Sequence, residues 1–136
     1  HFLEAREYLD EYSAVRFAAP EKEMALIHRE PYACPEPTML LNEGDVITLG
    51  ETELRVIETP GHTRGGVCFA TDKEIFTGDT LFRLSVGRTD LPTGDWYTLV
   101  DSIKNKLYTL DDGMIVYPGH GAPTTIGYEK RANPFV

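Results

Sequence analysis

Residues 56–63 read "VIETPGHT", and two later segments of the chain have the same design. Residues 75–80 read "IFTGDT", and residues 115–121 read "IVYPGHG". Each is a short apolar run, typical of a strand, that ends at a glycine and is followed by a polar side chain. Glycine lets the backbone turn sharply, and a preceding proline stops the strand. We expect the polar side chains to reach one crevice from the strand ends. They are His62, Asp79 and His120.

Imidazole and carboxylate groups are the ligands that zinc and related divalent ions prefer. Taken singly, each residue has an ordinary alternative, since a lone loop histidine is usually solvated and an aspartate after glycine is usually a turn residue. The joint pattern favours the metal site. We therefore predict that His62, Asp79 and His120 bind metal, and that Asp79 and His120 are also catalytic.

Length, composition and charge narrow the class of protein. The chain has 136 residues, of which 41% are hydrophobic and 26% are charged, as expected for one globular domain spanning residues 1–136. The formal net charge of −9 weighs against nucleic acid as a partner, because such a partner requires a basic face. No apolar run approaches the length of about 20 residues that spans a membrane, and the first residues do not resemble a signal peptide.

The two cysteines, Cys34 and Cys68, form no CxxC pair, so neither a thiolate metal site nor a disulfide is expected. Cys68 lies in a strand-like run and is predicted to pack in the core, whereas Cys34 lies among prolines and is predicted to be in a loop. Free thiols without a leader sequence favour the cytoplasm.

Periodicity predicts a mixed α and β order rather than a repeat of βα pairs. Two hairpins are expected, 45–49 with 53–58 and 67–71 with 74–78. The other predicted segments are helices at 2–12, 20–28, 96–107 and 126–133 and strands at 14–18 and 114–117.

Four motifs in this order, "TPGHT", "FTGDTLF", "VGRTDLPTGD" and "YPGHGAPTTIGYEKRANPF", resemble the metallo-β-lactamase superfamily. The resemblance is closest to its small bacterial glyoxalase II-like hydrolases. It implies an α+β fold, an αββα sandwich of two facing mixed sheets with helices outside. It also implies that His62 binds a first metal, that Asp79 bridges both metals and that His120 binds the second.

The family's His-x-His-x-Asp-His signature is absent, and this departure defines a further prediction. The last histidine of that signature opens a helix like "FLEAREYLDEY", so the resemblance makes His1 a ligand of the second metal; the alternative is a residue foreign to the protein. We interpret the chain as the C-terminal portion of the domain, lacking the N-terminal strands. By itself it is expected to be inactive or impaired, with an uncovered apolar face through which a homodimer is expected to form.

The resemblance implies a metal-dependent hydrolase whose two divalent ions, zinc first and iron or manganese as alternatives, share a hydroxide. A small-molecule thioester such as an acyl-glutathione is the leading substrate. A persulfide dioxygenase-like enzyme with a single iron is the main alternative, because it shares a similar "GRTD" element, and a metal-free, non-catalytic member of the fold is another. A β-lactamase is less favoured, because the best-known zinc β-lactamases carry cysteine where Asp79 stands.

Cations near the motifs are candidates for binding a substrate carboxylate. Arg83 and Lys130 are the predicted substrate-binding residues, whereas Arg88 is expected to pair with Asp90 or Asp95 and pin its loop. The hydroxyl groups beside the predicted ligands have two possible roles. They would either hydrogen-bond to the ligands and fix their orientation or serve as ordinary turn hydroxyls. They belong to Thr59, Thr63 and Thr80.

Overall fold

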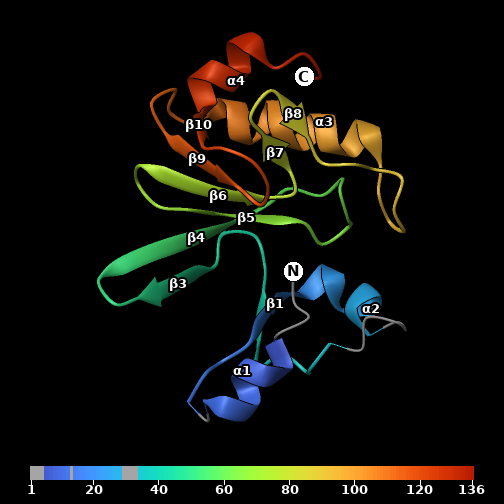
Figure 1. Ribbon diagram of the computed structural model, residues 1–136, viewed down its shortest axis with the longest axis vertical. Coiled ribbons are helices and arrows are strands. Elements are labelled where there is room, and N and C mark those ends of the chain that lie inside the picture. Colours follow the sequence, from blue (N-terminus) through green and yellow to red (C-terminus); the bar gives the residue numbers. More distant parts are fainter. Residues whose placement is uncertain (1–4, 13, 29–33) are drawn as a thin grey trace.

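A computed structural model of the chain describes residues 5–12, 14–28 and 34–136 (Figure 1). Its helices are α1 (Ala5–Glu11), α2 (Met24–Ile27), α3 (Trp96–Asn105) and α4 (Ile126–Ala132), with 3-10 turns η1 (Glu21–Glu23) and η2 (Leu107–Thr109). Its strands are β1 (Ala18–Pro20), β2 (Met39–Leu41), β3 (Val46–Leu49), β4 (Thr52–Glu58), β5 (Val67–Ala70), β6 (Glu74–Gly78), β7 (Leu81–Phe82), β8 (Ser85–Val86), β9 (Ile115–Pro118) and β10 (Thr124–Thr125). In this described part, no helix is long and apolar enough to cross a membrane.

A six-stranded sheet in the order β10-β9-β6-β5-β4-β3 forms the centre of the molecule. Its neighbours pair antiparallel except for β6 and β9, which run parallel. Both predicted hairpins are confirmed as β3–β4 and β5–β6. The strands β1 and β2 pair separately, parallel to each other, on the side of the sheet away from α3 and α4 (Figure 1). The mixed α+β order and the separate sheets agree with the expectation of an incomplete αββα sandwich.

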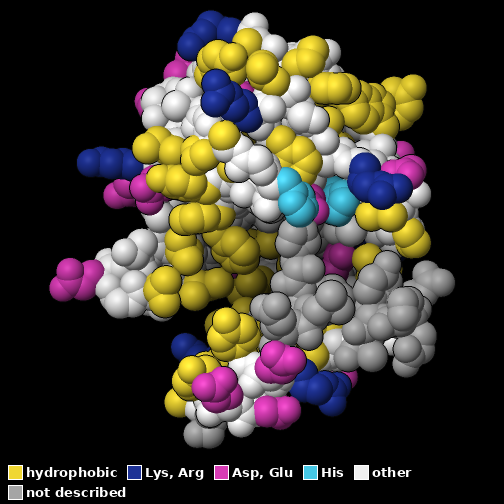
Figure 2. Space-filling model, viewed as in Figure 1, with side chains coloured by type: hydrophobic (Ala, Val, Ile, Leu, Met, Phe, Trp, Pro, Cys, Tyr) yellow, Lys and Arg dark blue, Asp and Glu magenta, His cyan; other side chains and the backbone are white. Residues whose placement is uncertain are grey.

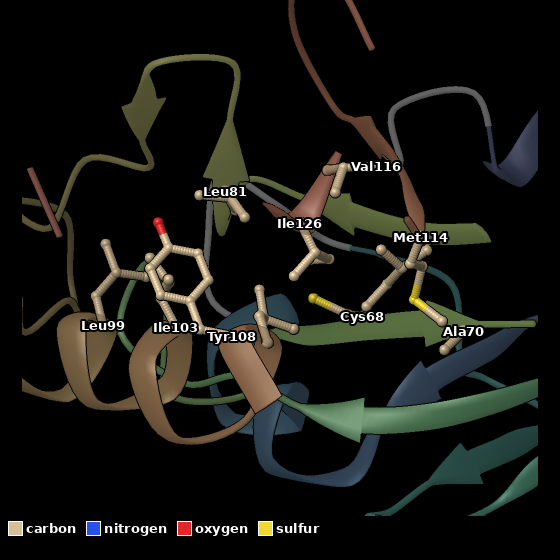
Figure 3. Close-up of a cluster of buried hydrophobic side chains, with 11 residues drawn as sticks. Cys68, Ala70, Leu81, Leu99, Ile103, Tyr108, Met114, Val116 and Ile126 are labelled. Atoms are coloured by element: carbon tan, nitrogen blue, oxygen red, sulfur yellow. The ribbon is translucent and has the colours of Figure 1, made fainter. Parts of the chain in front are cut away.

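One face of the sheet is buried beneath the C-terminal helices (Figure 3). On α3, Leu99 comes three positions after Trp96, and Ile103 comes four positions after Leu99, so these side chains share one face of the helix. Leu99 and Ile103 are both fully buried. Their partners on the sheet alternate with outward side chains, as a pleated strand requires. The buried cluster also contains Cys68, Ala70, Ile75, Leu81, Leu107, Tyr108, Met114, Val116 and Ile126. The core position predicted for Cys68 is therefore confirmed.

The opposite face of the sheet is also apolar, although it is less covered. Phe76 and Tyr117 stack on neighbouring strands with ring centroids 5.4 Å apart, and Phe76 is 42% exposed. Figure 2 shows hydrophobic side chains in yellow over much of the strand region in this view. The predicted homodimer through an uncovered face stays a prediction.

Two predictions near the N-terminus need comment. The strand expected at 14–18 is wrong in position, because β1 begins only at Ala18, where its backbone can pair with β2 in the register Ala18 to Met39. Cys34 lies outside any helix or strand, as predicted, and it is buried in a small cluster with Ala19 and Ile27. Apolar alternation alone did not indicate the short partner strand at Met39–Leu41. Both cysteines are free, as expected.

Tyr108 gives a prediction about stability. Within the described residues, its buried hydroxyl has no hydrogen-bond partner. A buried polar group without a partner destabilises the folded state, so we expect Tyr108→Phe to raise the free energy of unfolding by about 1 kcal/mol at neutral pH. Urea denaturation measures this change. The exposed Tyr97→Phe is the matched control and should change the free energy of unfolding by no more than about 0.5 kcal/mol.

The same residue also predicts a pH dependence. Burial, with a smaller contribution from the charge of Glu129, raises the pKa of Tyr108 to about 12. The unfolded phenol ionises near pH 10, so the unfolded chain loses its proton first. The contribution of the protonated Tyr108 phenol to the free energy of unfolding is complete below pH 10. It falls by roughly 2 kcal/mol as pH rises toward 12. Tyr108→Phe should lack this part of the decline, and an equal decline in the variant would contradict the assignment.

Candidate metal centre

Strand direction explains how three distant segments meet. Strands β4 and β5 are antiparallel, β5 and β6 are antiparallel, and β6 and β9 are parallel. Strands β4, β6 and β9 therefore run the same way, and their carboxyl ends reach the same edge of the sheet. Each of the three motifs follows one of these ends, so the chain topology brings the predicted ligands together.

The three predicted ligands converge at this edge. The Nε2 atom of His62 lies 3.6 Å from Oδ2 of Asp79, and Nε2 of His120 lies 3.4 Å from Oδ1 of the same carboxylate. The Asp79 side chain is 16% exposed, that of His62 is 20% exposed and that of His120 is 64% exposed. One half-buried carboxylate thus faces an imidazole on each side, and the His120 side is the more open to solvent.

The tautomer of His62 is fixed by its second nitrogen. Its Nδ1 lies 2.7 Å from the backbone carbonyl oxygen of Arg88, which can only accept, so Nδ1 carries the proton. In the neutral ring, Nε2 then carries a lone pair, and this lone pair is directed at Oδ2 of Asp79. Two acceptors facing one another favour a cation between them, and a backbone carbonyl behind the imidazole is the usual support of a metal-binding histidine. The donor set therefore fits a divalent metal ion.

The loop that carries His62 is fastened to α3. The Ser102 hydroxyl donates to the carbonyl of Pro60 at 2.7 Å, and the Asp95 amide donates to the carbonyl of Gly61 at 2.8 Å. Asp95 also caps α3, since its carboxylate accepts from the Thr98 amide and this hydrogen bond lowers the pKa of Asp95. Consequently, the helix that fills the core also sets the position of the His62 loop.

The loop that carries His120 is held against β6 and β7. The Gly119 amide donates to the carbonyl of Gly78 at 2.8 Å, and a Cβ atom at position 119 would lie 2.6 Å from Oδ1 of Asp79. The ring of Phe82 contacts the His120 imidazole edge-on, with centroids 5.9 Å apart. Glycine is required before His120 because the Asp79 carboxylate occupies the space of a side chain.

The predicted cations have different surroundings. Arg83 lies over the ring of Tyr128, with its Cζ atom 5.9 Å from the ring centroid, and it lines a hollow with Thr124 and Tyr128. Lys130 is not brought to Asp79, because its Nζ lies 3.4 Å from Asp112 Oδ1 at the other end of β9. The substrate role of Lys130 is therefore without geometric support in this structure.

The prediction that Arg88 pins its loop is confirmed. Arg88 donates from Nε and Nη2 to the two carboxylate oxygens of Asp90, at 2.7 and 2.6 Å. The hydrogen bond from Arg88 is the main reason that the pKa of Asp90 falls to about 2. The pair is exposed, so its contribution to stability is expected to be small, and the carbonyl of the same Arg88 lies behind His62.

The hydroxyls of Thr59 and Thr80 lie beneath the site, 3.0 Å from each other, and Thr59 Oγ1 is 3.2 Å from Cys68 Sγ. They stabilise the strand ends and are not bonded to either imidazole. His1, the fourth predicted ligand, lies outside the described residues. Across 5–12, 14–28 and 34–136, no three or more His, Cys, Asp or Glu side chains surround one ion position, so the described residues offer two pairs, His62 with Asp79 and His120 with Asp79, rather than one three-ligand site.

Sequence reasoning did not identify Glu129 as important, although it is fully buried beside the site. Its Oε2 accepts from the Leu84 amide at 2.8 Å and from Asn133 Nδ2 at 2.9 Å, and its Oε1 accepts from the Thr124 hydroxyl at 2.6 Å. Leu84 has a φ of 55°, a turn conformation that costs energy in a leucine. Glu129 therefore holds the β7–β8 turn that carries Phe82 and Arg83.

We expect Glu129→Ala to lower the free energy of unfolding by about 3 kcal/mol or more, because it leaves three donors without their acceptor. Glu129→Gln should cost about 1 kcal/mol, since the Thr124 hydroxyl can turn to accept from the new amide while the remaining oxygen keeps the Leu84 and Asn133 hydrogen bonds. Denaturation and hydrogen exchange at the Leu84 amide measure both. Equal losses in the two variants would contradict this role.

Comparison with known proteins identifies the class. The family model described as "Metallo-beta-lactamase superfamily" matches residues 1–120, and the chain belongs to this superfamily. The chain spans about half the length of the curated relatives it matches. It is 47% identical over 96 residues to the hydroxyacylglutathione hydrolase GloC of Haemophilus influenzae, covering 69% of this chain and 45% of that protein.

Solved structures agree with the fold. The chain resembles a di-iron-bound form of TTHA1623, with a TM-score of 0.86 and 32% identity over 100% of this chain and 72% of that one. It also resembles the B3 metallo-beta-lactamase BLEG-1, with a TM-score of 0.85 and 34% identity over 96% of this chain and 69% of that one. The likeness to ETHE1 from Myxococcus xanthus has a TM-score of 0.73 and 27% identity, over 98% of this chain and 69% of that one.

Proposed function

We propose that the protein acts as a metal-dependent thioester hydrolase with two divalent cations, zinc first and iron or manganese as alternatives. The observation that carries the metal site is the His62 imidazole, whose Nδ1 faces the Arg88 carbonyl while Nε2 faces the Asp79 carboxylate. The thioester substrate is supported by the 47% identity to a protein named hydroxyacylglutathione hydrolase.

The residues have distinct roles in this proposal. His62 and His120 hold one cation each, Asp79 joins the two, and His1 is assigned as a ligand on the His120 side. When bound, such cations supply Lewis acidity and lower the pKa of a water molecule toward about 7. Asp79, with one oxygen toward each imidazole, would offer one carboxylate oxygen to the cation beside each histidine. Arg83, which lines a hollow with Thr124 and Tyr128, is assigned to a carboxylate on the substrate.

The alternative is a persulfide dioxygenase-like reaction with one iron ion, and the similarity to ETHE1 at 27% identity supports it. The metal-free reading predicts neither activity. We would prepare the full-length gene product with zinc, manganese or iron and measure thiol release from acyl-glutathione and oxygen consumption with glutathione persulfide. Metal-dependent thiol release is expected. Oxygen consumption with iron alone would favour the alternative, and no activity with any metal would favour the metal-free reading.

A further inference from the structure

A cavity of 490 Å³ opens beside the candidate metal centre, with His62 and Asp79 at one end. This volume is within the range of about 300–1,000 Å³ that is typical of small-molecule sites. One wall comes from the segment of β1 and α2, with Phe17, Leu26 and Ile27, and another from the loop residues Leu91 and Pro92. The cavity is therefore built by parts of the chain distant in sequence, and it leads to the centre.

The charge of the cavity limits what it can hold. No lysine or arginine lines it among the described residues, and its ionisable groups are His62, Asp79, Glu23 and Cys34. Glu23 Oε2 accepts a hydrogen bond from the Gly65 amide at 2.7 Å, so the Glu23 side chain is bound to the loop that follows His62. Burial raises the pKa of the Cys34 thiol, so Cys34 stays neutral. The charge of Arg6 acts on Cys34, but Arg6 is not among the described lining residues. Away from the cations proposed at His62 and Asp79, an anionic chain would therefore lose hydration along these walls, whereas an apolar chain would be stabilised.

The cationic surface lies elsewhere. A second hollow of 350 Å³ is lined by Arg83, Pro123, Thr124, Thr125 and Tyr128, from the segments that follow Phe82 and His120 in the chain. The two hollows thus differ in charge: among the described residues, no lysine or arginine lines the one that contains His62 and Asp79, whereas Arg83 lines the other. A thioester has two ends that differ in the same way when its acyl chain is apolar and its thiol bears a carboxylate.

We propose that the apolar cavity receives the acyl chain of the substrate, while the anionic thiol lies toward Arg83. The inference rests on the proposed hydrolase function and narrows its substrate class to thioesters of unbranched, uncharged acyl chains. Longer chains bury more methylene groups in the cavity until it is full. Because binding energy from parts remote from the reacting carbonyl contributes to the transition state, chain length should raise kcat/KM.

The test uses acetyl, butanoyl and hexanoyl thioesters of N-acetylcysteamine, an uncharged thiol, with the full-length gene product. We expect kcat/KM to rise by roughly fourfold for each added methylene. Leu91→Glu places a charge in the cavity wall and should remove this dependence. Leu91 contributes only its backbone carbonyl to the loop, as acceptor for the Gly94 amide, so the variant should fold. Leu49→Glu, on the exposed strand β3, is the matched control and should keep the dependence.

A binding measurement separates the cavity from the chemistry. The 2-alkanones carry the same chains and are not hydrolysed, and NMR of the methyl groups of Leu26, Ile27 and Leu91 reports their binding to the metal-free protein. Hydrolysis without any chain-length dependence, or unchanged by Leu91→Glu, would overturn the cavity proposal and leave the hydrolase. Chain-dependent ketone binding without hydrolysis would overturn the hydrolase and retain the cavity as an apolar-ligand site.

Discussion

Asp79→Asn is expected to lower thioester hydrolysis by at least about a hundredfold while leaving the fold intact. Removing a group that merely supports a metal ligand costs about 10–100-fold, and Asp79 is itself the residue that both imidazoles face. The amide keeps the shape of the carboxylate but loses its charge and one acceptor oxygen, so it cannot join two cations. Steady-state kinetics of the full-length gene product in zinc-containing buffer measure the loss.

The matched control is Asp72→Asn, in the exposed turn between β5 and β6, which should keep full activity. Circular dichroism and the free energy of unfolding of the metal-free proteins show whether Asp79→Asn is folded. Full activity in folded Asp79→Asn would contradict the bridging role. A parallel loss in Asp72→Asn would indicate that the change acts on the protein as a whole.

Gly61→Ala is expected to be among the most destabilising single substitutions, lowering the free energy of unfolding by about 3 kcal/mol or more. Gly61 has a φ of 140°, which is strained for alanine, and the added Cβ would lie 2.3 Å from the Cα of Leu99. The obstacle is backbone in α3, where a helix buried in the core cannot move aside cheaply. The loop carrying His62 would have to leave α3, so activity should fall with stability.

Gly44→Ala is the control for backbone strain alone, because Gly44 has a φ of 82° and no atom within 4 Å of the added Cβ. It should cost about 1 kcal/mol. Equilibrium urea denaturation of both variants under the same conditions measures the difference. Equal costs for the two substitutions would mean that the contact with Leu99 is unimportant and that the loop position is set by other interactions.

Local pattern identified much of this molecule. The apolar periodicity of residues 96–107 identified α3, and glycine-bounded apolar runs identified β4, β5 and β6. These signals succeed because burial on one face imposes period 2 on strands and period 3.6 on helices. The convergence of His62, Asp79 and His120 was also predicted, because each follows a strand end.

The rest depends on contacts that no local pattern contains. The two-residue strands β7 and β8 are too short for any period, and their turn is held by Glu129, 45 positions from Leu84. The carbonyl of Arg88 that orients His62 is a backbone atom, and any residue type supplies one. Lys130 pairs with Asp112 because of the way α4 packs, and the positive charge of Lys130 alone does not indicate which partner it will have.

The central claim is that His62, Asp79 and His120 form one metal centre. The most direct test is titration with Zn²⁺, a diamagnetic ion, while NMR follows the histidine imidazole signals, with His28, which faces Glu36, as internal control. We predict that the His62 and His120 signals shift together, that Asp79→Asn uncouples or abolishes both shifts, and that His28 is unchanged. Shifts of equal size at His28, or shifts at His62 and His120 that persist unaltered in Asp79→Asn, would contradict it.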